Sequence, residues 1–433
     1  MSLHLPSSNS QFTAMRVPSG YKRTEVGIIP EDWESTNVRG VASAARNAIV
    51  GGPFGSDLVS ADYVDDGVPV IRGTNMSGQW VSGPFVFVTG KKAKVLEANL
   101  ARPGDIVFTQ RGTLGQVSLV SEKSFPKYLV SQSQMKVSLN HDLADPLFYY
   151  YVFTGEQHQR IIRDRTIQTG VPHINLGILK EIPVQRPKLP EQHAIAKALS
   201  DMDALLGALD NLITKKRDLK QAAMQQLLTG KTRLPGFHGE WKMKRLDAIA
   251  SITRGASPRP IDSPIWFDEK SSIGWVRISD VTKSEMFLRE TTQRLSALGV
   301  KSSRPVGSGS LIMSICATVG RPIITTIDTC IHDGFVVFNF LRIDQSLLYY
   351  VLKSIEPDWG KHGQTGSQMN LNTSLIKRTE VSLPADKAEQ TAIAEVLSDM
   401  DAELAALEQR RAKTHALKQG MMQELLTGRT RLV

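Results

Sequence analysis

Two stretches of the sequence carry apolar residues at the alternating spacings of three and four that are typical of a coiled-coil helix. The first stretch has them at Ile195, Leu199, Met202, Leu206, Leu209 and Ile213. The second stretch has them at Ile393, Leu397, Met400, Leu404 and Leu407. Because this spacing places the side chains along one face of a helix, we predict two long helices that pack through these residues.

The two helical stretches are copies of one another. Residues 191–234 align without a gap to residues 389–432 at a constant offset of 198, and 27 of the 44 aligned positions are identical. Gly230 and Gly428 stand at matching places near the ends, where a left-handed glycine commonly closes a helix. A repeat of this length predicts a chain built from two similar halves.

The regions outside the helices repeat more weakly, in the same order. Trp33 matches Trp241, and short β-prone runs such as DIVF, GWVRI and FVVFNF alternate with Gly, Pro, Ser and Asn. We therefore predict an α+β fold with two mixed sheet domains separated by two long helices. The predicted boundaries are a flexible N-terminal tail at 1–18, sheet domains at 19–186 and 235–383, and helices at 187–234 and 384–433.

Charge is distributed in the same order along both helices. Residues 191–210 contain four acidic and one basic residue, whereas 211–234 contain six basic and one acidic; the second helix has six acidic and no basic residues in 389–408, then six basic and one acidic in 409–432. One explanation is that the charge order simply complements the macrodipole of each helix and says nothing about how the helices pair. If the helices pair, an antiparallel arrangement sets acid against base at both ends. We therefore predict antiparallel helices that relate the two halves by a pseudo-two-fold axis.

Overall composition narrows the class of protein. The 433 residues include 52 Lys and Arg against 43 Asp and Glu, a net charge of +9, which favours a polyanionic partner without requiring one. Cys316 and Cys330 are the only cysteines, which is typical of a reducing compartment, and we expect a cytoplasmic protein. No signal peptide or transmembrane pattern is visible in the sequence, so no membrane association is expected.

Three enzyme-like signals do not develop into catalytic motifs. Gly230, Lys231 and Thr232 could end a phosphate-binding loop, but position 225 is Gln and the lysine becomes Arg429 in the second half. Cys316, Cys330 and His332 lack the spacing of a metal site. We find no glycine-rich cofactor loop after a strand, and no Asn or Asp followed by two prolines and an aromatic residue. We expect no catalytic residue, no metal and no cofactor in this chain.

Polar residues in matching loops suit DNA recognition instead. Arg can donate two hydrogen bonds to guanine, Gln can pair with adenine, and glycine allows backbone amides to approach phosphate. The predicted DNA-binding residues are Arg72, Asn75, Gln110, Arg111, Thr113, Gln168 and Thr169 in the first half, and Arg277, Asp280, Thr318, Arg321, Gln364 and Thr365 in the second. The alternative is that the repeated Gly and Thr positions hold turns and the repeated Arg residues form salt bridges inside each domain. The runs GGPFGS at 51–56 and RGASPRP at 254–260 are likewise either turns or loops that contact a nucleic-acid backbone.

Several motifs together resemble a known family. Both helices open with EQxAIAxxLSxMD and end with LLTGxTRL, GYKRTEVGIIPEDWE stands near the N-terminus, and LPGFHGEW begins the second half. With these motifs, doubled across nearly the whole chain, the sequence resembles a specificity subunit of a Type I restriction-modification system.

This resemblance implies that the two sheet domains are target recognition domains, each of which reads one part of a bipartite sequence in double-stranded DNA. It implies that the helices are spacers and docking surfaces for two methyltransferase subunits, and that restriction/translocase subunits join the complex. S-adenosylmethionine, ATP and magnesium are then implied for the partner subunits and none for this chain. We expect the apolar positions from Ile195 to Ile213 and from Ile393 to Leu407 to serve the coiled coil and partner contacts. Leu205, Leu212 and Leu228 would then face outward.

Three other functions are compatible with parts of this pattern. The chain could be a coiled-coil scaffold without DNA recognition, or the specificity subunit of a methylation system that has no nuclease. An enzyme that joins recognition domains to a methyltransferase or nuclease in one chain is a further alternative, but the chain has no room for such a domain beyond its repeated halves.

Overall fold

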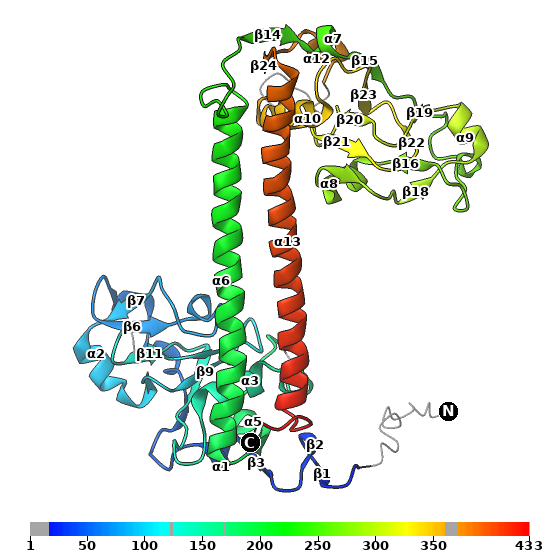
Figure 1. Cartoon of the computed structure of the whole chain (residues 1–433). Helices are drawn as coiled ribbons and strands as arrows, with labels where there is room; N and C mark the ends of the chain where they lie inside the picture. The colour runs from blue at the N-terminus through cyan, green and yellow to red at the C-terminus, as the bar shows by residue number, and fades with distance from the viewer. Residues whose placement is uncertain (1–16, 122–123, 169, 360–370, 433) are drawn as a thin grey trace. The chain divides into compact units, whose positions relative to one another are not determined.

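The computed structural model describes residues 17–121, 124–168, 170–359 and 371–432, and it divides into two compact units. The first unit contains the chain up to residue 208 and from 411 onward, and the second contains residues 209–410. The chain contains two 39-residue helices, α6 (Leu189–Leu227) and α13 (Lys387–Leu425) (Figure 1). One half of each helix belongs to the first unit and the other half to the second. Each unit therefore combines one sheet domain with two half-helices that are distant in the sequence.

The first unit is built on two main sheets. Its antiparallel sheet has the order β10-β9-β12-β4, and its mixed sheet has the order β5-β7-β6-β11-β8, in which β6 and β11 are parallel. The strands of these sheets are β4 (Ile49–Gly51), β5 (Tyr63–Val64), β6 (Val68–Ile71), β7 (Val86–Val88), β8 (Leu100–Ala101), β9 (Ile106–Thr109), β10 (Val117–Leu119), β11 (Tyr128–Val130) and β12 (Gln134–Val137). Two further ladders pair β1 (Tyr21–Thr24) with β2 (Gly27–Pro30), and β3 (Glu34–Asn37) with β13 (Pro183–Arg186).

Short helices connect the strands of the first unit. The α-helices are α1 (Val38–Val41), α2 (Gly90–Val95), α3 (Pro146–Thr154), α4 (Glu156–Asp164) and α5 (Leu176–Lys180), and the 3-10 turns are η1 (Gly55–Asp57), η2 (Ser60–Asp62), η3 (Gly73–Asn75) and η4 (Glu97–Asn99). Asp145 caps the start of helix α3, because its side chain accepts a hydrogen bond from the Phe148 amide, and Pro146 suits the first helical turn. The aromatic side chains of α3 share one core with Leu199 of α6 and Leu425 of α13. This core fixes the sheet domain to both half-helices.

The second unit repeats the central strand order of the first, although the corresponding sheets differ in their number of strands. The order β15-β23-β20-β21 matches β4-β12-β9-β10, and the parallel pair β16 and β22 matches β6 and β11. The strands are β14 (Trp241–Arg245), β15 (Ser251–Arg254), β16 (Gly274–Val276), β17 (Phe287–Leu288), β18 (Gln293–Arg294), β19 (Arg304–Val306), β20 (Leu311–Ser314), β21 (Pro322–Thr325), β22 (Thr329–Ile331), β23 (Phe335–Asn339) and β24 (Glu380–Pro384). The helices are α7 (Leu246–Ile249), α8 (Ile278–Lys283), α9 (Ala297–Lys301), α10 (Gln345–Ser354), α11 (Glu356–Trp359), α12 (Thr373–Arg378) and the 3-10 turn η5 (Pro264–Trp266).

The core of the second unit shows where one prediction was wrong. Helix α10, which corresponds to α3, packs with Ile393 and Leu397 of α13 and with Leu227 and Leu228 at the end of α6. Leu228 was expected to face outward, but it is buried because α6 ends at Leu227 and the following turn directs the next side chain into this core. Leu205 and Leu212 are exposed, as expected.

The predicted seam residues differ in burial. The buried ones are Ile195, Leu199, Leu206, Leu209, Ile213, Ile393 and Leu397, and the half-buried ones are Met202, Met400, Leu404 and Leu407. Ion pairs accompany the seam in each unit. In the second unit Lys216 contacts Glu403 at 2.6 Å and Lys220 contacts Asp401. In the first unit the Lys418 Nζ atom lies 2.5 Å from Asp203. Within each unit, the basic half of one helix thus lies against the acidic half of the other, in antiparallel order.

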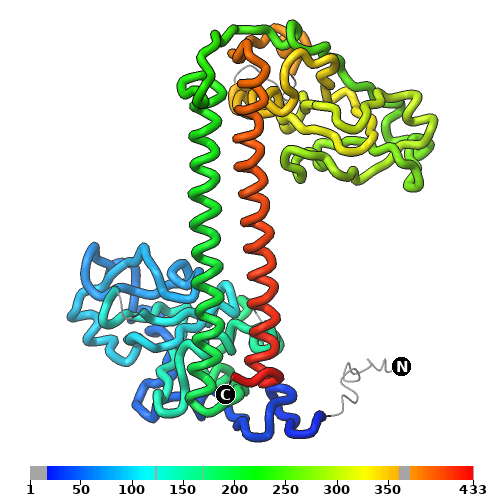
Figure 2. Tube along the Cα trace, in the orientation of Figure 1, coloured from blue at the N-terminus to red at the C-terminus, as the bar shows by residue number. Residues whose placement is uncertain are grey.

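The chain ends close to its first described strands. Figure 2 shows the red C-terminal segment beside β1 and β2, and the Tyr21 hydroxyl donates a hydrogen bond to the carbonyl oxygen of Gly428 at 3.0 Å. Nearly all of the tail predicted at 1–18 lies outside the described residues. No helix in the described part of the chain is both long and apolar enough to span a membrane.

Candidate functional site

Four segments meet at one end of the antiparallel sheet in the first unit: the β9–β10 loop at 110–116, the turn at 131–134, the glycine-rich loop at 51–58, and the described residues 166–168 and 170–174. The Gln110 amide donates to the carbonyl oxygen of Ser133 at 2.7 Å, and the Ile174 amide donates to the carbonyl oxygen of Gln110 at 3.1 Å. The Gly52 amide donates to the carbonyl oxygen of Gln134 at 2.9 Å. Backbone hydrogen bonds therefore gather loops that are far apart in the sequence.

Only glycine at position 52 allows the glycine-rich loop to approach the turn at 131–134 this closely. A Cβ atom placed there would lie 1.8 Å from the carbonyl oxygen of Ser131, which no side chain can tolerate without backbone movement. The neighbouring Gln132 side chain then holds the rest of the loop, because its amide donates to the carbonyl oxygens of Gly55 at 2.5 Å and Leu58 at 3.1 Å. The glycine-rich loop is therefore fixed on the turn at 131–134.

Most of the polar residues predicted in these loops are available to a ligand. Arg111, Thr113 and Gln168 are exposed, and within the described part of the chain no hydrogen bond or ion pair engages their side chains. Gln110 is half-buried beside Gly51. Together they present guanidinium, hydroxyl and amide groups, which are the groups that read base edges and contact phosphate.

Asn75 has a structural role that sequence reasoning did not anticipate. Its side-chain oxygen accepts a hydrogen bond from the Arg72 amide at 3.0 Å, and its side-chain nitrogen donates to the carbonyl oxygens of Ser82 and Pro84 at 2.9 and 2.8 Å. The residue is fully buried, so we exclude it from the candidate surface. Arg72 is half-buried beside the same turn.

The second unit gathers three of the matching segments in the same way, namely the β20–β21 loop, the turn at 332–334 and the loop at 254–259. The Ile315 amide donates to the carbonyl oxygen of Gly334 at 2.8 Å, which joins the β20–β21 loop to the turn at 332–334. The Gly255 amide donates to the carbonyl oxygen of Phe335 at 2.9 Å, and a Cβ atom at Gly255 would lie 2.0 Å from the carbonyl oxygen of His332. This repeats the arrangement of Gly52 against Ser131.

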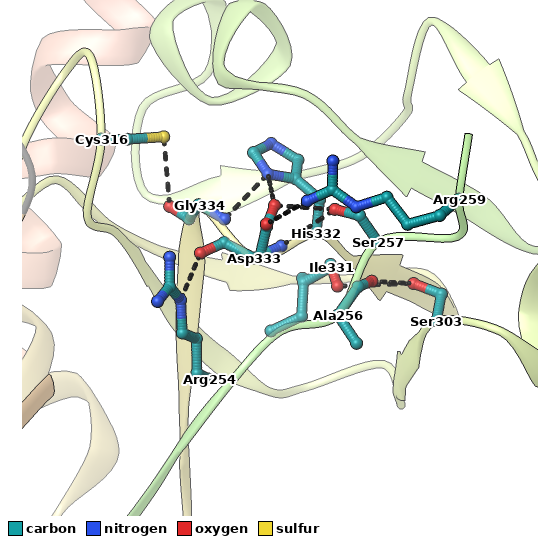
Figure 3. Close-up of polar contacts among 10 residues, drawn as sticks. All are labelled: Arg254, Ala256, Ser257, Arg259, Ser303, Cys316, Ile331, His332, Asp333 and Gly334. Carbon is teal, nitrogen blue, oxygen red and sulfur yellow. Dashed lines mark hydrogen bonds and ion pairs between the residues drawn. The ribbon is translucent and has the colours of Figure 1, made fainter. Parts of the chain in front are cut away.

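Asp333 holds the 254–259 loop in the second unit, as Figure 3 shows. It accepts hydrogen bonds from the Ser257 hydroxyl at 2.7 Å and from the Arg259 guanidinium at 3.0 Å, while Arg254 donates to its carbonyl oxygen at 2.6 Å. Burial raises the pKa of Asp333, but the Ser257 hydrogen bond and the Arg259 charge outweigh that effect and leave the pKa below its usual value. A charged carboxylate therefore occupies the place that Gln132 fills in the first unit.

The other predicted residues of the second unit divide by burial. Arg277 is exposed and Thr318 is half-buried. Arg321 is half-buried, and its Nη2 atom donates to the carbonyl oxygen of Ser284 at 2.9 Å, so part of its guanidinium is used within the domain. Asp280 is buried and accepts hydrogen bonds from the amides of Arg277 and Thr292, which makes it the structural counterpart of Asn75.

Three predicted residues, Thr169, Gln364 and Thr365, lie outside the described residues. Sequence reasoning also missed two residues that organise the loops, Gln132 and Asp333. They occupy equivalent turns but differ in side-chain chemistry, so a search for repeated residues could not find them.

The sulfur and imidazole groups near this cluster are buried or hydrogen-bonded within the domain. The thiol of Cys316 donates to the carbonyl oxygen of Gly334 at 3.7 Å, and burial raises its pKa. Burial lowers the pKa of His332, whose Nδ1 atom accepts a hydrogen bond from the Gly334 amide at 2.9 Å. Cys330 is buried in a separate apolar cluster. Among the described residues, no group of three or more His, Cys, Asp or Glu side chains is placed to hold a metal ion.

The chain matches one family model twice. Residues 30–216 and 238–415 match the Type I restriction modification DNA specificity domain. The chain is 22% identical over 424 residues to the Type I restriction enzyme MjaVIII specificity subunit of Methanocaldococcus jannaschii, covering 93% of this chain and 94% of that protein. It is also 22% identical to the putative MjaX specificity subunit of the same organism over 442 residues, covering 95% and 97%.

A solved structure shares the fold. The crystal structure of the Type I restriction-modification S subunit from M. genitalium aligns with a TM-score of 0.57 at 16% sequence identity, covering 91% of this chain and 96% of that chain.

Proposed function

Since the chain belongs to the Type I restriction-modification DNA specificity family, we propose that it is the non-catalytic subunit that selects the DNA sequence on which such a system acts. The observation that carries this proposal is the pair of equivalent loop clusters, one in each family-matched region. Each cluster gathers polar loops at one end of a sheet. Exposed Arg111 lies in the first cluster, and exposed Arg277 directly follows β16 in the second unit. Two reading surfaces in one chain suit a bipartite target.

In this proposal each unit reads one half-site, meaning one of the two defined parts of the DNA target. The reading residues are the accessible members of the predicted set: Arg72, Gln110, Arg111, Thr113, Gln168, Arg277, Thr318 and Arg321. Asn75 and Asp280 instead shape the loops that carry Arg72 and Arg277. Arginine is suited to guanine because its two donors match the two acceptors that guanine presents in the major groove.

We also propose that α6 and α13 form an antiparallel coiled coil, which separates the two domains and relates them by pseudo-two-fold symmetry. The apolar seam and the ion pairs within each unit support it, since acidic and basic half-helices face one another in both. A helix pair of this kind would set the gap between the half-sites. The equivalent contacts of Asp203 with Lys418 and of Asp401 with Lys220 support the symmetry.

We further propose that partner subunits supply the chemistry. Two adenine-N6 methyltransferase subunits and restriction/translocase subunits would dock on this chain in the cytoplasm and bring the sites for S-adenosylmethionine, ATP and magnesium. Exposed leucines on α6, Leu205 and Leu212, support docking along the helices, because exposed apolar residues are stabilised when a partner covers them.

A domain exchange tests the proposal. Residues 19–186 are replaced by the same region of a related specificity subunit, and the methylated DNA motif is read with the cognate methyltransferase subunit present. The proposal predicts that one half-site changes and the other stays. Exchange of residues 235–383 is the matched control and should change only the other half-site. If both chimaeras support methylation of the original motif, the chain is a scaffold and the proposal is wrong.

A further inference from the structure

Phe54 is held out into solvent by a loop that is otherwise well anchored. Its side chain is 90% exposed, although Pro53 before it and Leu58 at the end of the same loop are buried. Leu58 belongs to an apolar cluster beneath the mixed sheet of the first unit. A large apolar ring gains free energy from burial, so a fixed loop that keeps it exposed calls for a specific explanation.

Five hydrogen bonds fix the backbone around Phe54. The Asn99 side chain donates to the carbonyl oxygen of Gly51 at 2.7 Å, and the Gly52 amide donates to Gln134. The Gln132 side chain donates to the carbonyl oxygens of Gly55 and Leu58, and the Asp57 amide donates to the carbonyl oxygen of Phe54 itself at 2.9 Å. The ring is thus presented on a loop whose backbone is held by five hydrogen bonds, which suits an inserting side chain.

The surroundings of Phe54 are those of the proposed reading surface. The turn at 131–134 that holds its loop also holds the β9–β10 loop, which carries Arg111 and Thr113. Gln110, in that same loop, lies beside Gly51. An exposed ring on a loop that shares its anchoring turn with a loop of arginine, glutamine and hydroxyl donors suits the way in which proteins insert apolar side chains between base steps while polar groups hold the backbone.

We propose that Phe54 is an aromatic wedge that stacks against an opened base step in the half-site read by the first unit. This inference rests on the proposed function and adds a DNA-contacting residue to it. It also predicts an asymmetry, because the equivalent 254–260 loop carries no aromatic residue and directs Arg259 to Asp333 instead. Only one half-site should therefore be opened by the chain itself.

The test uses 2-aminopurine, whose fluorescence rises when a base loses its stacking partner. The complete complex of this chain with its methyltransferase subunits is bound to duplexes that carry the probe at successive positions of each half-site, leaving out the adenines that become methylated. We expect a fluorescence rise at one step of the first unit's half-site. The Phe54→Ala complex should lose that rise and bind the target roughly tenfold more weakly, as expected for the loss of one base–aromatic stack. Phe54→Trp should retain the rise.

Phe340→Ala is the matched control. The Phe340 side chain is also exposed, at 87%, but it follows the last residue of β23, whereas the 332–334 turn precedes the first. Its removal should therefore leave the fluorescence rise unchanged. Equal fluorescence and affinity for wild type and Phe54→Ala would overturn the wedge while leaving DNA recognition intact. Loss of methyltransferase binding by Phe54→Ala would instead assign Phe54 to a protein interface and also overturn it. If the wild-type complex methylates no split motif, the proposed function fails, and the wedge fails with it.

Discussion

Arg431 binds Glu191 across 240 positions of the sequence, with its Nε atom 2.5 Å from one carboxylate oxygen and its Nη2 atom 2.8 Å from the other. Trp33 donates to the same carboxylate from its indole nitrogen at 2.9 Å. The second unit repeats the constellation with Arg233 and Trp241 on Glu389. In each unit these contacts join the end of one helix, the start of the other and the sheet domain.

Removal of the arginine should destabilise the first unit. Arg431→Ala leaves the buried Glu191 carboxylate with Trp33 as its remaining donor in this constellation, and an uncompensated buried charge costs about 3–5 kcal/mol. Arg429→Ala is the control, because that exposed side chain pairs with Glu424 on the surface and should cost at most about 1 kcal/mol. Urea unfolding measures both changes. Equal losses for the two variants would show that the Glu191 pair has no special role.

Substitution of a loop glycine should disturb the candidate surface directly. Gly255→Ala places a methyl group 2.0 Å from the carbonyl oxygen of His332, and such overpacking costs about 1–3 kcal/mol. Gly239→Ala is the matched control. No atom lies within 4 Å of the added carbon, so this variant should leave the stability unchanged. Thermal unfolding compares the two variants, and a neutral Gly255→Ala would contradict the close approach of the loop to the turn.

Stability should fall in acid because of His158. This side chain is buried, donates from Nε2 to the carbonyl oxygen of Pro183 at 3.1 Å, and burial lowers its pKa to about 4. The unfolded chain, with a usual histidine pKa of about 6.5, binds this proton more readily. The contribution of neutral His158 to the free energy of unfolding is therefore complete above pH 6.5. It is lost as the pH falls toward 4, by about 3 kcal/mol in total.

The pH dependence of unfolding in wild type and His158→Gln checks this expectation. Glutamine can donate a hydrogen bond but does not titrate in this range, so the variant should lose less stability between pH 6.5 and 4. Parallel curves for the two proteins would rule out His158 as the titrating group.

Two arginines should affect different half-sites. Arg111→Ala should relax base preference only in the half-site read by the first unit, and Arg277→Ala only in the other, each by about 1–3 kcal/mol per base contact. Asn75→Ala serves as the comparison: it removes a buried cap and should lower stability without a change of preferred base. Methylation rates on single-base variants of the target separate these effects. Relaxation of the same half-site by both arginine variants would contradict separate reading surfaces.

The sequence was informative where the two halves repeat and silent where they differ. The acid-to-base order along both helices predicted ion pairs between antiparallel half-helices, and the structure contains such pairs within each unit. Trp33 and Trp241 also repeat, but the sequence did not predict their contacts with Glu191 and Glu389. Asn75 and Asp280 also repeat, but a side chain that caps a short helix has the same sequence signature as one that faces a ligand. Burial and the hydrogen bonds of these two side chains distinguished the two roles.

The remaining features depend on backbone geometry. Leu228 enters the core because α6 ends one residue earlier, a boundary that apolar spacing could not determine. Gln132 and Phe54 carry no repeat signal, since their counterparts have different chemistry. Their importance emerges only from the hydrogen bonds that fix the loop at 51–58.

The most direct test of DNA recognition is genome-wide mapping of N6-methyladenine in cells that express this chain with its cognate methyltransferase subunit, compared with cells that lack only this chain. We predict a split motif, with two short defined parts around an unspecified gap, that is methylated only when the chain is present. Identical methylation in the two strains, with the complex shown to assemble, would contradict the assignment of this chain as the DNA-reading subunit.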